Sequence, residues 1–195
     1  MGFSYFSTYQ IREIMKLTPI KELPQEKPSE GSYKEFESPD GKLKMKYPSD
    51  WAETETIDVT QLISQEFLKK YDIRLPLFAL KVDQEGQFFQ LIVMEMQLTH
   101  QGNFEEVINI LKEINSPKGW DMEIVKKTGE GREIVFETEY RKLGQSNVYA
   151  KEKMLFLELE EKKQKIYIIT VSGPERDWQK FSEEAGFIID SVSSL

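Results

Sequence analysis

Strand-like segments follow one another along most of this sequence, separated by turns of only a few residues. The segment Lys42 to Tyr47 alternates strictly, with Leu43 and Met45 on the same face as Tyr47, which is typical of a half-buried strand. Strands joined by such short turns must run antiparallel, because a parallel crossover needs a dozen or more residues. The turn signals are Pro39-Asp40-Gly41, Asp83-Gln84-Glu85-Gly86, Thr128-Gly129-Glu130-Gly131 and Leu143-Gly144-Gln145-Ser146. The sequence therefore predicts an antiparallel sheet.

Roughly eight strands are expected, and the last four form a meander. By the same patterns they span residues 33–38, 42–47, 75–82, 87–98, 120–127, 132–142, 148–158 and 165–172.

Three further segments predict helices. Asp58 with Gln61 resembles a capping box and opens a helix over residues 59–71. Asn103 with Glu106 opens another over residues 104–114. A final helix is expected to begin near Ser172, which we interpret as its N-cap, with Pro174 in the first turn. Because hairpins separate these helices, we expect an α+β fold, an antiparallel meander with helices packed on it.

The chain divides into an arm and a domain. We assign residues 1–31 to an N-terminal arm that ends in a Pro/Glu-rich linker, and residues 32–195 to one domain. The arm is interpreted as a segment that docks on the domain or on a second copy, with a membrane or partner anchor as the alternative. No apolar run approaches the roughly 20 residues of a transmembrane helix. The first 20 residues show no secretory signal, which taken alone indicates the cytoplasm.

Composition excludes several classes of function. The 195 residues contain no cysteine, so disulfides, thiolate nucleophiles and cysteine-based zinc or iron–sulfur sites are excluded. One histidine, His100, cannot form a multi-histidine metal centre. The 26 Lys and Arg against 34 Asp and Glu give a net charge of −8, which argues against nucleic-acid binding.

The candidate catalytic motifs all have simpler structural explanations. Ser172 lacks the G-x-S-x-G context of a hydrolase nucleophile, and its expected capping role accounts for it. His100 is interpreted as a solvated loop residue, with a catalytic base or metal ligand as the alternative. Gly129-Glu130-Gly131 lacks the third glycine of a phosphate-binding loop and fits a hairpin turn better. We therefore predict no catalytic, cofactor-binding or metal-binding residues and no cofactor.

Charged and aromatic clusters are also explained by structure. Glu158, Glu160 and Glu161 fit a solvated hairpin tip, and Asp83 with Glu85 lacks the calcium-binding EF-hand pattern. Two groups of residues also have a functional interpretation. The lysines on one face of the strand at residues 42–47 can contact an anionic partner, and the three tryptophans can line a ligand groove or contact a partner. Their structural explanations are an outer sheet face for Lys42, Lys44 and Lys46, and core packing for Trp51, Trp120 and Trp178.

Two segments resemble the PsbP-like family. Residues 36–51, FESPDGKLKMKYPSDW, are similar to the opening of these domains: a strand, a turn, an alternating strand and Y-P-x-x-W. Residues 167–178, YIITVSGPERDW, continuing to Ile188-Ile189-Asp190-Ser191-Val192, are similar to the closing strand, helix and terminal strand. The resemblance implies the α/β/α sandwich of the Mog/PsbP-like type. Photosynthetic members are extrinsic lumenal proteins that support photosystem II, and other members are often lipoproteins or secreted, which implies an extracytoplasmic location.

The absence of a reactive constellation and the resemblance together predict a non-catalytic binding or assembly module. We expect a protein partner, with contact at a membrane surface as a further option. The alternatives are a carboxylate-based hydrolase with residues scattered in sequence and a small-GTPase-binding module like the Mog branch. Two carboxylates that converge in a deep pocket would favour the hydrolase, whereas a shallow surface with exposed apolar side chains would favour binding.

Overall fold

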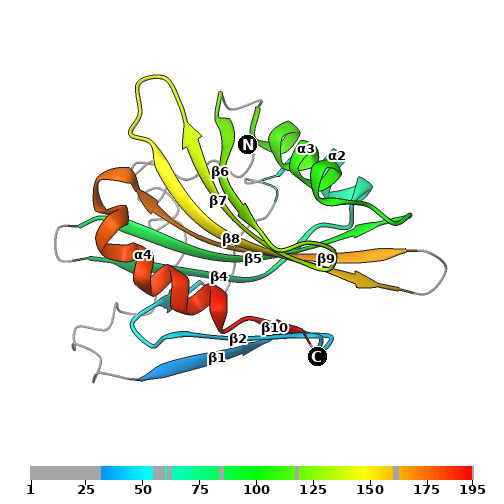
Figure 1. The fold of residues 1–195 in the computed structure, drawn as a ribbon, viewed down its shortest axis with the longest axis horizontal. Coiled ribbons are helices and arrows are strands. Elements are labelled where there is room, and N and C mark those ends of the chain that lie inside the picture. Colours follow the sequence, from blue (N-terminus) through cyan, green and yellow to red (C-terminus); the bar gives the residue numbers. More distant parts are fainter. Residues whose placement is uncertain are drawn as a thin grey trace.

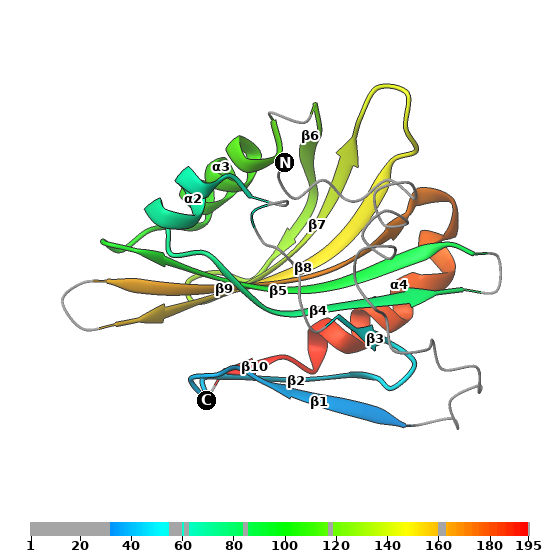
Figure 2. The ribbon, with the colours of Figure 1, turned by 180° about the vertical axis from the view of Figure 1, so that it is seen from behind.

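The computed structural model describes residues 32–54, 60, 63–83, 86–116, 119–159 and 163–194. These residues form a twisted seven-stranded sheet, a three-stranded sheet and three helices (Figures 1 and 2). Every neighbouring pair in the large sheet is antiparallel. In spatial order its strands are β3 (Ala52–Glu53), β4 (Arg74–Val82), β5 (Phe88–Leu98), β9 (Gln164–Pro174), β8 (Val148–Glu158), β7 (Glu133–Arg141) and β6 (Asp121–Thr128).

The strand order follows from one long connection and a series of hairpins. After β5 the chain passes through α3 (Phe104–Asn115) to the far edge of the sheet, where β6 begins. Three successive hairpins then bring it back until β9 pairs with β5. In the first of these hairpins Gly129 has a φ of +84°, and a Cβ there would lie 2.6 Å from the carbonyl oxygen of Glu133. Only glycine fits this turn, and the predicted meander is confirmed.

One face of the large sheet is covered by a helix and the small sheet, side by side. The small sheet has the order β1 (Tyr33–Glu37), β2 (Leu43–Pro48), β10 (Ser193–Ser194), and the helix is α4 (Glu175–Asp190). The alternation predicted for β2 is confirmed: Leu43, Met45 and Tyr47 are buried against the large sheet together with Phe181 and Ile188 of α4. Figure 1 shows α4 above β1 and β2 on this face.

The opposite face is covered by α2 (Gln65–Lys70) and α3 (Figure 2). In β5 the two faces alternate: Ile92 and Met94 belong to the core under α3, whereas Leu91 and Val93 belong to the core under β2 and α4. In α3 the inward residues include Val107, Ile108, Leu111 and Ile114, at helical spacing. Two cores on opposite faces of one sheet make the predicted α+β sandwich, which is confirmed.

A charge cluster fastens the β1–β2 turn to the large sheet. The Nζ of Lys165 lies 2.8 Å from Oε1 of Glu95 and 3.0 Å from Oδ2 of Asp40, and the hydroxyl of Tyr167 donates to Oδ1 of Asp40 at 2.7 Å. Burial alone would raise the pKa of Asp40, but hydrogen bonds from Ser38, Tyr167 and Lys165 outweigh it and hold that pKa well below its usual range. Asp40 therefore stays ionised and the turn stays paired.

Two local predictions at the end of the chain are wrong. Ser172 is not a helix cap, because β9 keeps pairing with β5 and β8 past it, and α4 begins only after Pro174, whose side chain makes no capping bond. The predicted terminal strand around Ile188 is part of α4, whose apolar face is buried under the sheet, and only Ser193–Ser194 pair with β2. Helical packing of Ile188 and Ile189 thus outweighs their preference for strands.

Some predictions concern residues that lie outside the described part of the chain. Asp58 and Gln61 lie outside them, and the helix described in that region, α2, begins at Gln65 with Ser64 as its N-cap. The arm, residues 1–31, also lies outside, so the boundary at residue 32 stays a prediction. Among the described helices, none combines the length and apolarity needed to cross a membrane.

Candidate functional site

An open groove lies between α4 and strands β7 and β8 of the large sheet, and we call it the outer groove. Its volume is about 500 Å³. The helix side of the groove is formed by residues 175, 178, 179 and 182, which lie on one face of α4 because they are spaced three or four residues apart. The sheet wall comes from β8 and β7, where Lys151 lies directly opposite Glu137 in the register. The lining residues are Glu137, Tyr149, Lys151, Glu175, Trp178, Gln179 and Ser182.

Two aromatic rings line the outer groove. Tyr149 and Trp178 stack with ring centroids 6.4 Å apart and an interplanar angle of 27°. Trp178 also meets the buried Phe181 edge-on at 5.8 Å, which fixes it to the core. The pKa of the Tyr149 hydroxyl is raised, first by burial and then by the negative charges of Glu139 and Glu175. The phenol therefore stays neutral, and the wall offers an apolar ring surface with a polar tip.

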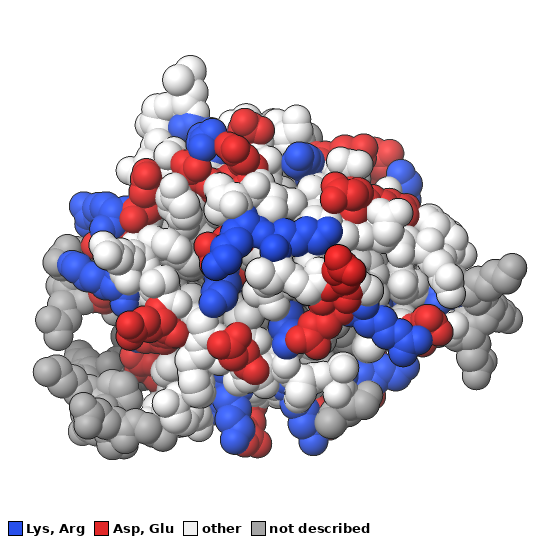
Figure 3. Space-filling model, in the orientation of Figure 1, with Lys and Arg blue, Asp and Glu red and all other residues white. Residues whose placement is uncertain are grey.

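Charges of both signs surround the outer groove. A neighbouring hollow of about 180 Å³ shares Glu137 and Lys151 with it and adds Lys126 and Asp190. Figure 3 shows the same mixture across this whole face, with acidic and basic side chains interspersed. Such a surface is suited to polar and ionic contacts with another protein, and it lacks the single-sign field of a nucleic-acid-binding face.

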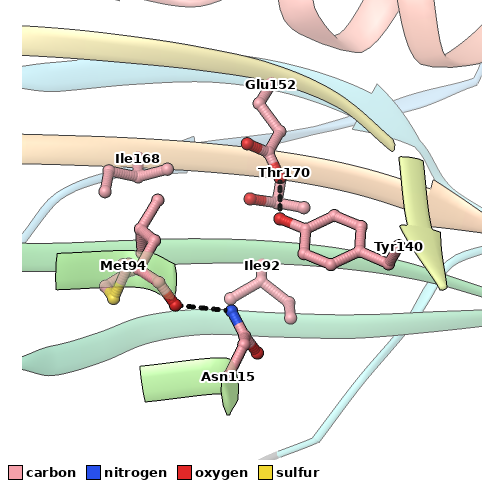
Figure 4. A pocket seen from close by; sticks show the side chains of 8 residues that line it. Ile92, Met94, Asn115, Tyr140, Glu152, Ile168 and Thr170 are labelled. Atoms are coloured by element: carbon pink, nitrogen blue, oxygen red, sulfur yellow. Dashed lines mark hydrogen bonds between the residues drawn. The ribbon is translucent and has the colours of Figure 1, made fainter. Parts of the chain in front are cut away.

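A second, much smaller cavity lies inside the molecule between α3 and the large sheet (Figure 4). Its volume is about 20 Å³, and Asn115, Tyr140, Glu152 and Thr170 supply its polar lining. The hydroxyl of Tyr140 donates to Oε1 of Glu152 at 2.9 Å. One carboxylate lines this cavity, so the pair that a carboxylate-based hydrolase needs is not assembled there. A cavity of this size also has no room for a substrate without movement of α3.

The structure gives local partners to His100 and Asp83 and buries Ser172. The Nε2 of His100 lies 2.8 Å from Oε1 of Glu106 in an exposed pair at the start of α3. Ser172 is buried inside β9 and lines neither the outer groove nor the interior cavity. Asp83 accepts a hydrogen bond from the backbone N–H of Gln87, which closes the β4–β5 loop. Among the described residues, no group of three or more His, Cys, Asp or Glu side chains could hold a metal ion.

The basic strand face is paired with acids on β1. Lys44 lies 3.1 Å from Glu37, and Lys46 lies 3.2 Å from Glu35. These pairs are half-exposed, so they form a solvated outer face of the small sheet. Glu158 pairs with Arg132 at 3.0 Å, while Glu160 and Glu161 lie outside the described residues, as does Glu85.

The three tryptophans have different roles. Trp51 is fully buried, and its Nε1 donates to Oε1 of Glu184 at 2.8 Å. Trp120 is buried in the core under α3, with the Nζ of Lys142 5.7 Å from its ring centre. Core packing is thus confirmed for both. The half-buried Trp178 also packs against the core, through Phe181, and in addition lines the outer groove, so both interpretations apply to it.

Sequence reasoning missed most of the outer groove. Tyr149 and Lys151 stand two apart in β8 and so share a face, and the α4 residues share a helical face, but these patterns are visible only when the register is known. Glu152 alternates with Ala150 and Met154 on the inner face of β8, and a carboxylate at such a position was a usable signal for the interior cavity.

No protein-family model matches the chain, and no curated protein matches its sequence. Among solved structures, LpqN of Mycobacterium tuberculosis, a protein involved in cell envelope biogenesis, is similar with a TM-score of 0.50 at 9% identity, over 94% of this chain and 96% of LpqN. Cyanobacterial PsbP (CyanoP) of Synechocystis is similar with a TM-score of 0.54 at 12% identity, over 88% of this chain and 99% of CyanoP. A point mutant of the protein Mog1 matches with a TM-score of 0.48 at 10% identity, over 84% of this chain and 96% of Mog1.

These similarities concern the fold alone, because identities of 9–12% are too low to carry residues or activities across. The chain thus shares its fold with LpqN and CyanoP, and the predicted resemblance to PsbP-like proteins is confirmed at the level of the fold.

Proposed function

We propose that this protein is a non-catalytic binding module that holds a polypeptide partner in the outer groove. The observation that carries the proposal is the Tyr149–Trp178 pair, which lines an open groove of about 500 Å³. Tryptophan and tyrosine are the side chains most enriched where protein interfaces concentrate their binding energy. Such a groove contributes a complementary shape and contact area to a bound partner.

The charges of the groove favour a partner segment with a basic side chain. Glu137 and Glu175 line it against the single lysine Lys151. The exposed faces of aromatic rings attract Lys and Arg as well. A partner arginine or lysine laid on Trp178 can therefore meet both a ring face and the carboxylate of Glu175. The overall charge of −8 adds a long-range attraction for such a segment.

Two further points support binding over the alternatives. The interior cavity offers one carboxylate and about 20 Å³, which disfavours the hydrolase. LpqN, which has the same fold, is involved in cell envelope biogenesis, and an extracytoplasmic assembly role agrees with that. A small GTPase as the partner, or a membrane surface in place of a protein, is an outcome that the following experiment distinguishes.

The test is photo-crosslinking in cells that express the full chain natively. Benzoylphenylalanine is placed at Gln179, which lines the groove, and in a matched control at Glu183, which is exposed on α4 but does not line it. We expect one adduct of defined mass from position 179, none of that mass from position 183, and loss of the adduct when Trp178→Ala is added. The adduct's mass spectrum identifies the partner, including any GTPase. Identical adducts from both positions, lipid adducts only, or no adduct would contradict the proposal.

A further inference from the structure

The sheet face under α3 carries buried polar side chains among its Ile, Met and Phe residues. In register, Gln90 of β5, Ser172 of β9, Ala150 of β8 and Thr138 of β7 form one cross-strand row. The side-chain oxygens of Gln90, Thr138 and Ser172, and Oδ1 of Asn115 in α3, are all buried without a hydrogen-bond partner. Buried polar atoms in native proteins nearly always have a partner, ordered water included. Of these four residues Asn115 lines the interior cavity, so its unpartnered oxygen points to bound solvent there.

The orientation of the Asn115 side-chain amide is fixed by a hydrogen bond. Its Nδ2 donates to the carbonyl oxygen of Leu111, one turn earlier in α3, at 2.8 Å. A carbonyl oxygen only accepts hydrogen bonds, so the amide cannot be flipped without losing this bond. The acceptor Oδ1 must then face away from the helix backbone, and Asn115 lines the interior cavity with only 2% of its surface exposed.

The cavity matches one water molecule in size and chemistry. Its volume of about 20 Å³ exceeds the roughly 10–15 Å³ that a single water needs, and is too small for several. Figure 4 shows Asn115, Tyr140, Glu152 and Thr170 around it, from α3 and three different strands. Buried waters typically make about three hydrogen bonds. Here Asn115 and the Tyr140 hydroxyl oxygen can accept, and the Thr170 hydroxyl can donate.

We propose that the interior cavity is a hydration site that holds one long-lived water molecule. The water donates to Oδ1 of Asn115, satisfies that orphaned acceptor, and links the C-terminal end of α3 to β7 and β9. It is an integral part of the core on this face of the sheet.

A crystal structure of the full chain at 1.5 Å or better tests the proposal directly. We expect one fully occupied peak about 2.7–3.2 Å from Oδ1 of Asn115, with two or three further polar partners. An empty cavity would overturn the proposal. Five or more oxygens at about 2.3–2.6 Å would reveal a metal ion in place of water and would overturn it too.

A variant pair gives a second test in solution. Asn115→Leu removes the acceptor with little change in shape, and Asn109→Leu is the matched control, because Asn109 is exposed on the same helix. Magnetisation transfer from water to protons around the cavity is expected in the wild type and in N109L, with the sign of a long-lived water, and is expected to disappear in N115L. Equal transfer in N115L, or none in the wild type, would refute the proposal.

Discussion

Replacing Lys165 by methionine tests whether the charge cluster at the β1–β2 turn holds the two sheets together. The Lys165 side chain is 11% exposed and that of Glu95 is 6% exposed, with 2.8 Å between Nζ and Oε1. Without the lysine, Glu95 is a buried carboxylate that has lost its cation. Breaking a buried pair in this way costs about 3–5 kcal/mol. For a chain of this size that corresponds to a fall in Tm of roughly 6–20 °C.

The matched control is Lys44→Met. Lys44 also has a carboxylate within 3.1 Å, that of Glu37, but both side chains are about half exposed. Exposed pairs contribute below about 1 kcal/mol, so K44M should unfold almost as the wild type does. The assay is urea unfolding followed by Trp fluorescence, with thermal unfolding alongside it.

The double variant Lys165→Met with Glu95→Gln refines the test. Neutralising Glu95 removes the buried unpaired charge, so the double variant should be more stable than K165M alone. The reasoning is refuted if K165M loses no more stability than K44M, or if adding Glu95→Gln to K165M causes a further loss.

Three other predictions concern Asp40, Gly173 and Asn103. The folded state lowers the pKa of Asp40, so at acidic pH it binds fewer protons than the unfolded state, where that pKa is about 3.9. The stability that Asp40 contributes is therefore present above about pH 3.9 and is lost as the pH falls below it. In urea titrations the difference in unfolding free energy between the wild type and Asp40→Asn should shrink from pH 6 to pH 3. Gly173→Ala should cost about 1–3 kcal/mol in the same assay, because its Cβ would lie 2.3 Å from the ring of Phe89, which packs against that of Phe181 with centroids 4.1 Å apart. An unchanged midpoint would count against this packing. Asn103→Ala should cost about 0.5–2 kcal/mol, because the Asn103 side chain accepts from the N–H of Glu106 at 3.0 Å, and a loss near zero would show that this cap is not formed.

The sequence was sufficient for the fold class and for the hairpin pairs, because the signals for these are local. It did not show that β1 and β2 form a separate small sheet with β10, or that β9 pairs with β5. The alternation in β2 predicts a half-buried strand, the glycine turns predict which strands pair as hairpins, and the cap at Asn103 predicts where α3 begins. The end of the chain was misread for the same reason: Ser172-Gly173-Pro174 has the local chemistry of a helix start, but pairing with strands on both sides holds Ser172 in β9.

The outer groove depends on long-range register, which a single sequence does not contain. Glu137 and Lys151 face each other only because β7 and β8 pair in one particular register, and Trp178 reaches Tyr149 only because α4 folds back onto β8. The interior cavity is similar, since Asn115 and Glu152 are far apart in sequence and meet only when α3 covers the sheet.

The most direct test of the binding role is calorimetric titration of the crosslinked partner, once purified, into wild-type protein, Trp178→Ala and Glu183→Ala. A tryptophan that anchors an interface contributes about 2 kcal/mol or more, so W178A should raise Kd at least about 30-fold. Glu183 is exposed on α4 and does not line the groove, so E183A should leave Kd within about twofold of the wild type. Equal Kd values for the wild type and a folded W178A would contradict the assignment of the outer groove.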